Sequence, residues 1–187
     1  MKKTPTLFIR STEDRRHVID QLNPDCLWVV RGEGVATRKY DGNCFMLDDE
    51  GSWWARREVK PGRPEPDGYQ VIGTDFITGK KMGWEPVKNS PFWRHLGAAA
   101  CRLDHHKPGT YELCGPHING NPEGYNQATL IRHDDAEVIH DVPVSFDGLR
   151  GFMASFPHEG IVWHHPDGRR AKLKRRDFGY GQKDGML

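Results

Sequence analysis

Glycine and proline interrupt this sequence so often that few stretches can form a long helix. The 187 residues include 21 glycines and 13 prolines, and residues 60–68 are too rich in both to form a regular element. Aromatic residues make up 10% of the chain and include six tryptophans, a composition that argues against disorder. The pattern therefore predicts short strands joined by turns.

Two helices and several strands are expected from the pattern. A helix is predicted over 11–22, where Ser11 resembles an N-cap, and another over 92–102 around an alanine-rich centre. Residues 44–47 and 52–57 flank a four-residue turn and predict a hairpin. Further strands are expected at 26–30, 110–114, 128–133, 159–163 and 171–174. These elements predict an α+β fold of mainly antiparallel β-sheets with flanking helices.

Length and charge limit the kinds of protein that this chain can be. A chain of this size is expected to form a single domain over 1–187, with a flexible tail at 180–187. The formal net charge is +1, so any binding of anions must come from local clustering of basic residues. No apolar run approaches the roughly 20 residues of a membrane span, and no secretory signal follows the N-terminus. A cytoplasmic, monomeric protein without a membrane partner is therefore expected.

The cysteines and histidines show no metal-binding spacing. The four cysteines form no Cys-x-x-Cys pair, which favours reduced thiols over a zinc clasp or a disulfide framework. The pairs His105-His106 and His164-His165 would point to opposite faces of a strand. We therefore expect no structural metal at these residues.

Lys39 precedes an Asp-Gly turn, Asp41-Gly42, immediately ahead of an expected strand. A lysine becomes a nucleophile only when its pKa is lowered, and neighbouring cations such as Arg38 or a dry pocket lower it. The alternative is a solvated lysine beside a hairpin turn, because so short a motif often occurs by chance.

Two glutamates lie in or beside apolar strands. Glu112 alternates with Tyr111 and Leu113, so it is expected on the face away from the core, in a cleft or in solvent. Glu159 precedes a glycine at the start of an apolar strand, a position that suits a ribose hydroxyl or a hydrated divalent metal. For both residues the alternative is an exposed charge.

Six of the eight residues from Arg169 to Arg176 are cations. If the segment is a strand, its alternation places four of them on one face: Arg170, Lys172, Lys174 and Arg176. Ala171 and Leu173 then occupy the opposite face. Four like charges on one face favour a phosphate-rich ligand over a solvated or disordered basic segment.

The order of these segments resembles the motif series of covalent nucleotidyltransferases, the superfamily of nucleic-acid ligases and mRNA capping enzymes. The matching segments are Lys39-x-Asp-Gly, Tyr111-Glu-Leu-x-Gly, Glu159-Gly-Ile-Val-Trp and Lys172-Leu-Lys. Flanking residues resemble the ATP-dependent RNA ligase family that includes animal RNA ligase 1 and phage relatives. Those residues are Trp54-Ala-Arg, Gly83-Trp-Glu-Pro-Val, Ile118-Asn-Gly-Asn-Pro and Lys174-Arg-Arg-Asp-Phe-Gly. The resemblance extends from about Val30 to Gly179 and implies a ligase-type adenylation domain without a C-terminal oligonucleotide-binding barrel.

The resemblance assigns the nucleophile and the phosphate ligands. It implies that Lys39 attacks the α-phosphate of ATP, forms a lysyl-AMP adduct and releases pyrophosphate. Lys172 and Lys174 would bind the α-phosphate and help to lower the pKa of Lys39. Arg56 would contact the nucleotide or an RNA 5′-phosphate.

The resemblance also assigns the nucleoside and metal ligands. Glu112 would bind the ribose, and His133 would take the place of the aromatic residue that stacks on adenine. Glu159 would hold hydrated Mg²⁺ or Mn²⁺, with Asp41 as a second ligand.

AMP would then pass to an RNA 5′-phosphate, and an RNA 3′-hydroxyl would displace it. Further candidates for phosphate contacts are Lys80, Lys81, Arg175, Arg176 and Lys183. The alternatives are another nucleotidyltransferase, either a guanylyltransferase or one that stops at AMP transfer, and a non-catalytic RNA-binding module.

Overall fold

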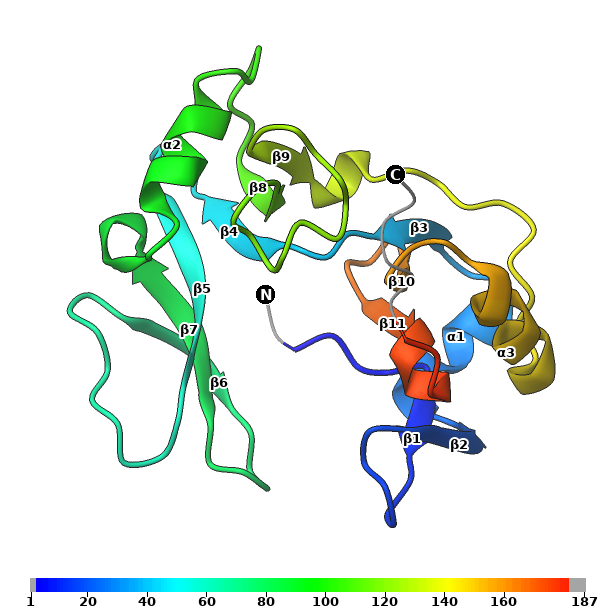
Figure 1. The fold of residues 1–187 in the computed structure, drawn as a ribbon. Coiled ribbons are helices and arrows are strands. Elements are labelled where there is room, and N and C mark those ends of the chain that lie inside the picture. Colours follow the sequence, from blue (N-terminus) through cyan, green and yellow to red (C-terminus); the bar gives the residue numbers. More distant parts are fainter. Residues whose placement is uncertain (1–2, 182–187) are drawn as a thin grey trace. The chain divides into compact units, whose positions relative to one another are not determined.

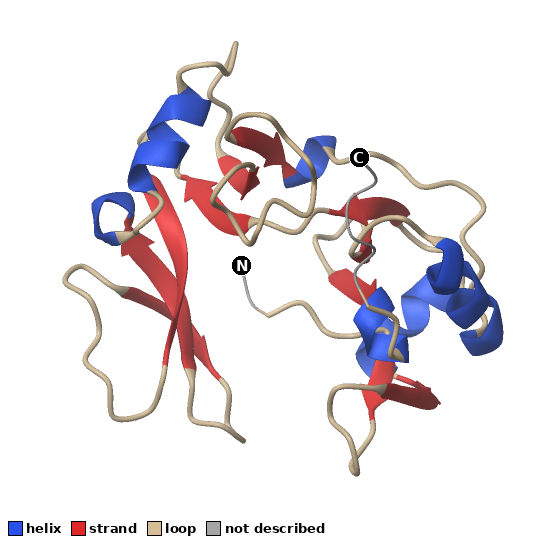
Figure 2. Ribbon diagram, in the orientation of Figure 1, coloured by secondary structure: helices blue, strands red, loops and turns tan. Residues whose placement is uncertain are grey.

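A computed structural model describes residues 3–181, and these residues divide into two compact units (Figure 1). Unit 1 contains Lys3 and Asp41–Asp135, and unit 2 contains Thr4–Tyr40 and residues 136–181. Of the expected tail, residues 182–187 lie outside the described part. In the described part, every pairing between strands is antiparallel, and three α-helices accompany the sheets (Figure 2). The expectation of an α+β fold with mainly antiparallel sheets is therefore confirmed.

Unit 1 contains a six-stranded sheet of order β6-β7-β5-β4-β8-β9. Its strands are β4 (Asn43–Leu47), β5 (Trp53–Val59), β6 (Gln70–Thr74), β7 (Lys81–Pro86), β8 (Gly109–Cys114) and β9 (Thr129–Arg132). Its helices are α2 (Trp93–Ala100) and the 3-10 turns η2 (Val87–Asn89) and η3 (His133–Asp135). The expected hairpin, the loop at 60–68, the helix over 92–102 and the strands at 110–114 and 128–133 are confirmed to within a few residues.

Unit 2 contains a three-stranded sheet of order β11-β10-β3 and a separate β1-β2 hairpin. Its strands are β1 (Phe8–Arg10), β2 (Val18–Leu22), β3 (Val35–Lys39), β10 (Gly160–His164) and β11 (Arg170–Lys174). Its helices are α1 (Leu27–Val30), α3 (Phe146–Ser155) and the 3-10 turns η1 (Pro24–Cys26) and η4 (Arg175–Phe178). The strands expected at 159–163 and 171–174 are confirmed.

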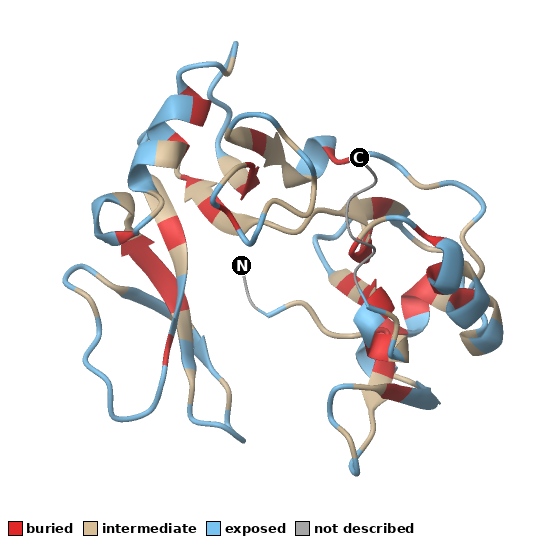
Figure 3. Cartoon of the chain, in the orientation of Figure 1, coloured by how far each residue is buried: buried red, intermediate tan, exposed pale blue. Residues whose placement is uncertain are grey.

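Each unit has its own apolar core (Figure 3). In unit 2 the inner face of β10 and β11 packs against α3, with Ile161, Leu173 and Leu149 fully buried. In unit 1 Phe45 and Leu113 pack with Leu96 of α2. Because side chains alternate along each strand, the opposite face of each sheet is left for polar residues.

The helix predicted over 11–22 is wrong. The Ser11 hydroxyl does accept hydrogen bonds from the backbone N–H groups of Glu13 and Asp14, but these bonds close an isolated turn. The β-branched Val18 and Ile19 then enter β2, which pairs with β1. A local cap is therefore present without the apolar face that would hold a helix against a core.

The strand predicted at 26–30 is also wrong, because this run forms the end of η1 and then α1. Asn23 caps the segment by accepting a hydrogen bond from the Asp25 N–H at 3.1 Å, and Pro24 occupies the first helical turn. Helix α3 was not expected, although its Ser145 cap, which accepts from the Gly148 N–H, is a readable start signal.

Among the described residues, no helix is both long enough and apolar enough to cross a membrane. None of the four cysteines forms a disulfide bond: Cys26 and Cys114 are buried, Cys44 is half-buried and Cys101 is exposed.

Candidate functional site

The outer face of the unit 2 sheet brings three lysines together. In the register of β3, β10 and β11, Gly160 lies opposite Lys39 on one side and Lys174 on the other. Lys172 lies two residues from Lys174 on β11 and therefore on the same face. We call Lys39, Lys172, Lys174 and the adjoining Glu159 the lysine cluster.

Gly160 allows its two neighbouring strands to approach closely. A Cβ atom at this position would lie 2.2 Å from the backbone oxygen of Leu173 and 2.8 Å from the Lys174 Cα. A larger residue would force β10 and β11 apart. The glycine that accompanies Glu159 in the sequence motif is thus required by the strand packing that positions Lys174.

Glu159 is the single carboxylate of the lysine cluster and is 9% exposed. Its Oε2 accepts a hydrogen bond from Lys39 Nζ at 2.6 Å, and its Oε1 accepts one from Lys174 Nζ. Lys39 Nζ also lies 3.3 Å from the Tyr40 carbonyl oxygen, which accepts a further hydrogen bond. The alternative of an exposed strand-end charge is therefore wrong for Glu159.

Charge and burial act together on the groups of the lysine cluster. Burial would raise the pKa of Glu159, but the ammonium groups of Lys39 and Lys174 outweigh it and hold this pKa below its usual value. Burial and then the neighbouring Lys174 and Lys39 lower the pKa of Lys172 to about 8. Burial, followed by the charge of Lys39, likewise lowers the pKa of Lys174. Three cations around one carboxylate leave an excess of positive charge that an anion would offset.

The alternation predicted for the cationic segment is confirmed within β11. Ala171 and Leu173 are fully buried, whereas Lys172 and Lys174 are half-buried on the other face. The expectation that Arg176 extends this strand face is wrong, because the strand ends at Lys174 and Arg176 belongs to η4.

Arg175 is not placed for a phosphate contact. Its side chain is buried, and its guanidinium donates hydrogen bonds to the backbone carbonyls of Met153, Ala154 and Phe156. These bonds attach η4 to the end of α3. Arg175 therefore has a structural role that sequence reasoning did not foresee.

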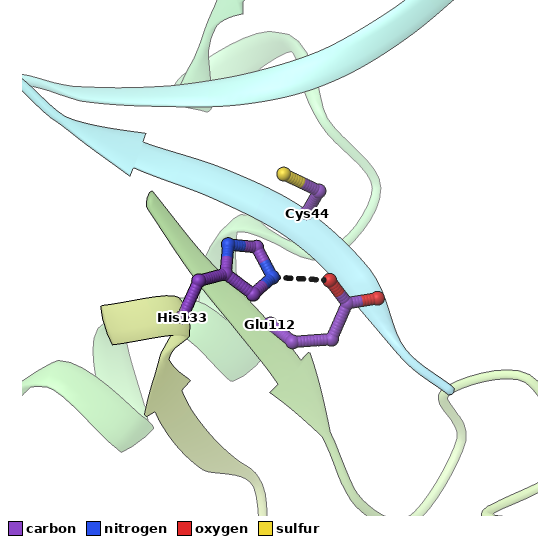
Figure 4. A group of neighbouring side chains, drawn as sticks. All are labelled: Cys44, Glu112 and His133. Carbon is purple, nitrogen blue, oxygen red and sulfur yellow. Dashed lines mark hydrogen bonds and ion pairs between the residues drawn. The ribbon is translucent and has the colours of Figure 1, made fainter. Parts of the chain in front are cut away.

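Unit 1 holds the second group of predicted residues, centred on Glu112 of β8. Its Oε1 accepts a hydrogen bond from the Gly42 N–H at 3.1 Å, and its Oε2 lies 3.0 Å from Nε2 of His133 (Figure 4). The other ring nitrogen of His133, Nδ1, lies 2.8 Å from the hydroxyl oxygen of Thr110. Glu112 is 8% exposed, so the alternative of an exposed strand glutamate is wrong here as well.

Cys44 joins Glu112 and His133 in a group that sequence reasoning missed. It lies directly opposite Glu112 in the pairing of β4 with β8. The Cys44 Sγ and one ligand atom each from Glu112 and His133 lie within 4.8 Å of one another (Figure 4). Only the strand register reveals this group, because its members are far apart in the sequence.

Asp41 and Arg56 also belong to unit 1. The Asp41 carboxylate accepts a hydrogen bond from Asn119 Nδ2 at 3.1 Å, and its backbone N–H donates to Glu123 at 2.8 Å. The Arg56 guanidinium lies over the ring of Trp84, 5.4 Å from its centroid. Both predicted residues are therefore held by neighbouring side chains.

The predicted site residues thus form two groups, one in each unit. Lys39, Glu159, Lys172 and Lys174 come together in unit 2, whereas Asp41, Arg56, Glu112 and His133 lie in unit 1. Lys80 and Lys81 form ion pairs with Glu58 and Glu65, and Lys183 lies outside the described residues. Neither a scan against models of protein families nor a search of curated proteins finds a match for this sequence.

Proposed function

We propose that this protein is an ATP-dependent RNA ligase that adopts the ligase-type adenylation fold and uses Lys39 as its nucleophile. The observation that carries the proposal is the lysine cluster: three lysines around one buried carboxylate on a single sheet face. Such a cluster suits a substrate with several negative charges, and ATP is one. The order of the four sequence motifs supports the same reaction.

Lys39 must leave its ion pair before it reacts, because an ammonium group has no lone pair with which to attack phosphorus. After loss of the proton, Nζ forms a bond to the α-phosphorus of ATP, and the bond from that phosphorus to the pyrophosphate oxygen breaks. Glu159 retains Lys174 as its partner when Lys39 turns to the substrate. The carboxylate is therefore never left as an unpaired buried charge.

Lys172 is the residue of the cluster best suited to bind phosphate. Its ammonium group is half-buried, and among residues 3–181 no carboxylate forms an ion pair with it. An α-phosphate would supply the missing negative charge and favour the protonated form of Lys172. Lys172 and Lys174 would then stabilise the charge that develops on the phosphoryl oxygens in the transition state.

The resemblance to RNA ligases assigns Glu112 and His133 to the nucleoside, and Arg56 to the nucleotide or the RNA 5′-phosphate. Glu112 can accept a hydrogen bond from a ribose hydroxyl. Both ring nitrogens of His133 are occupied, so a stacked adenine would use the face of its ring. Arg56 can bind a phosphate through its guanidinium group.

A magnesium or manganese ion is expected to accompany ATP, and its fit to the predicted ligands is incomplete. Carboxylate oxygens are the right donors for such an ion. However, both oxygens of Glu159 already accept hydrogen bonds from ammonium groups, and the Asp41 carboxylate accepts one from Asn119. The predicted metal ligands are therefore already engaged by other side chains.

Two further transfers would complete the reaction. An oxygen of an RNA 5′-phosphate attacks the lysyl-AMP phosphorus, so the N–P bond breaks and Lys39 is restored. The RNA 3′-hydroxyl then attacks the 5′-phosphate, and AMP leaves. The products are a sealed phosphodiester bond and free AMP.

The first test uses ATP labelled at the α-phosphate, with magnesium, followed by a denaturing gel. We expect a labelled band from the wild type and from Lys88→Ala, an exposed lysine outside the cluster, and no band from Lys39→Ala. Label from GTP in place of ATP would indicate a guanylyltransferase. No adduct with ATP, GTP or NAD from folded protein that is not already adenylylated would contradict the proposal and favour the RNA-binding module.

The second test supplies RNA with 5′-phosphate and 3′-hydroxyl ends to the adenylylated protein. We expect an adenylylated RNA 5′ end and then a sealed strand. If the lysyl adduct forms but no nick or end is joined, the protein is a nucleotidyltransferase that stops at AMP transfer.

A further inference from the structure

We propose that Cys44, Glu112 and His133 form a binding site for one zinc-type transition-metal ion. The site goes beyond the proposed ligase activity, but it shares Glu112 and His133 with the proposed nucleoside contacts, so a bound ion would compete with ATP for them. Among the described residues, these three side chains bring a thiol, a carboxylate and an imidazole close enough together to hold one ion.

Three neighbouring strands direct these side chains to one face of the unit 1 sheet. Cys44 comes from β4, Glu112 from the adjacent β8, and His133 directly follows β9 on the far side of β8. The opposite face is occupied by core residues such as Phe45 and Leu113. The sheet backbone therefore holds the three ligands in a fixed relation, so little conformational entropy opposes metal binding.

The spacing of the ligand atoms is close to that of a tetrahedral zinc centre. Zinc binds nitrogen and carboxylate oxygen at about 2.0–2.1 Å, so two such ligands at the tetrahedral angle lie roughly 3.3 Å apart. His133 Nε2 and Glu112 Oε2 are 3.0 Å apart, and the whole group lies within 4.8 Å. The His133–Glu112 pair would have to open by a few tenths of an ångström, and the Cys44 sulfur, which a tetrahedral centre places about 3.6 Å from the other ligand atoms, would have to move by up to about 1 Å.

Hydrogen bonds with neighbouring groups orient two of the three proposed ligands, His133 and Glu112. The Thr110 hydroxyl lies 2.8 Å from Nδ1 of His133, and a hydroxyl can either donate to this nitrogen or accept from it. When Nδ1 carries the proton, Nε2 is left with a lone pair directed at the site. The Gly42 N–H donates a hydrogen bond to Oε1 of Glu112 and so orients this carboxylate.

The ligand types select the class of metal. A thiolate and an imidazole favour zinc and similar transition metals, whereas magnesium and calcium prefer oxygen ligands alone. The side chains of Glu112 and His133 are 11% and 20% exposed, so an ion could enter yet be largely shielded from water. Three protein ligands leave a fourth position for water or another exchangeable ligand.

The test measures zinc binding to the full chain after removal of bound metal with a chelator, with no nucleotide present. Titration with Zn²⁺ should give one tight site per chain. Titration with Co²⁺ should give a thiolate-to-cobalt charge-transfer band, which reports bonding to sulfur. Both signals should be lost in Cys44→Ser. The loss of zinc affinity should exceed the roughly 10–100-fold that follows when only a hydrogen-bond partner of a metal ligand is replaced.

Cys101→Ser is the matched control, because Cys101 is exposed and lies outside the group. It should bind zinc as the wild type does, and zinc should protect Cys44 from alkylation in this variant. His133→Gln serves as a second ligand variant, and circular dichroism of the metal-free proteins checks that each variant is folded.

Absence of a tight zinc site would overturn the proposal. Equal zinc binding by Cys44→Ser would do the same and would direct attention to other histidines. Because no step of this test uses ATP, its failure and failure of the ligase proposal are distinguishable.

Discussion

The two units differ in sheet size and in the chemistry of the polar sheet face. Each has an antiparallel sheet with one face in an apolar core and charged or polar groups on the other face. In unit 2 the polar face carries three ammonium groups around one carboxylate, and in unit 1 it carries a carboxylate, an imidazole and a thiol. The first set suits a polyanion, and the second suits a metal ion or a nucleoside.

The difference shows how the partners of a buried carboxylate decide its role. Glu159 is neutralised by two cations, so it holds lysines in place and stays ionised. Glu112 has a backbone N–H and a histidine as its partners, so it keeps the capacity to accept other ligands. Glu112 lies within β8 and Glu159 immediately precedes β10, and the groups that face each carboxylate are what distinguish their roles.

The largest expected effect is a difference in the free energy of unfolding that is lost when each of these two carboxylates is removed. Glu159→Ala would remove the carboxylate that pairs with two half-buried ammonium groups, Lys39 and Lys174, and should lower the free energy of unfolding by about 3 kcal/mol. Glu112→Ala removes hydrogen bonds with the Gly42 N–H and with His133 and should lower it by about 1–2 kcal/mol. Urea unfolding monitored by tryptophan fluorescence measures both values.

Glu137→Ala is the control for this pair, since Glu137 is exposed and its ion pair with Arg38 is long at 3.4 Å. It should change stability by less than about 1 kcal/mol. Equal losses for Glu159→Ala and Glu112→Ala would show that the comparison between the two faces is wrong.

The second prediction concerns the pH dependence that Lys172 imposes. Its pKa is about 8 in the folded chain and 10.5 for an ordinary solvated lysine, so between these values the unfolded chain binds more protons. Stability contributed through Lys172 therefore rises as the pH rises from about 8 towards 10.5. Below this range the charged lysine should lower stability by at most about 3 kcal/mol.

Lys172→Met should accordingly be more stable than the wild type near neutral pH, with the difference shrinking as the pH increases. Free energies of unfolding measured across this range test the prediction, with Lys88→Met as an exposed control. A difference that grows with pH would contradict the sign of the effect. Added phosphate should raise the thermal stability of the wild type more than that of Lys172→Met.

The smallest effect is expected where the two units are alike. Gly97 lies within α2 of unit 1 and Gly151 within α3 of unit 2, and an added Cβ at either position meets nothing within 4 Å. Alanine at each position should stabilise the protein by about 0.5–1 kcal/mol, because glycine loses more conformational entropy in a helix. Thermal unfolding of the two single variants measures this gain, and destabilisation by either would show that the helix surface is not open there.

Strand patterns were predictable from the sequence where alternation and turn residues agree. Residues 44–47 and 52–57 flank a polar turn, and Ala171 and Leu173 alternate with lysines, so the hairpin and β11 could both be placed. The segment after Ser11 could not be placed correctly, because its capping hydrogen bonds also suit an isolated turn. Pairing with β1 decided that Val18–Leu22 is a strand.

The α+β character, the cationic strand and most of the candidate site residues could be identified from the order of residues alone. Which of those residues are neighbours depends on how the strands pair. Strand register placed Lys39 and Lys174 on either side of Gly160 and placed Cys44 opposite Glu112. The physical reason is that alternation along a strand is local, whereas pairing between strands depends on contacts between residues far apart in the chain.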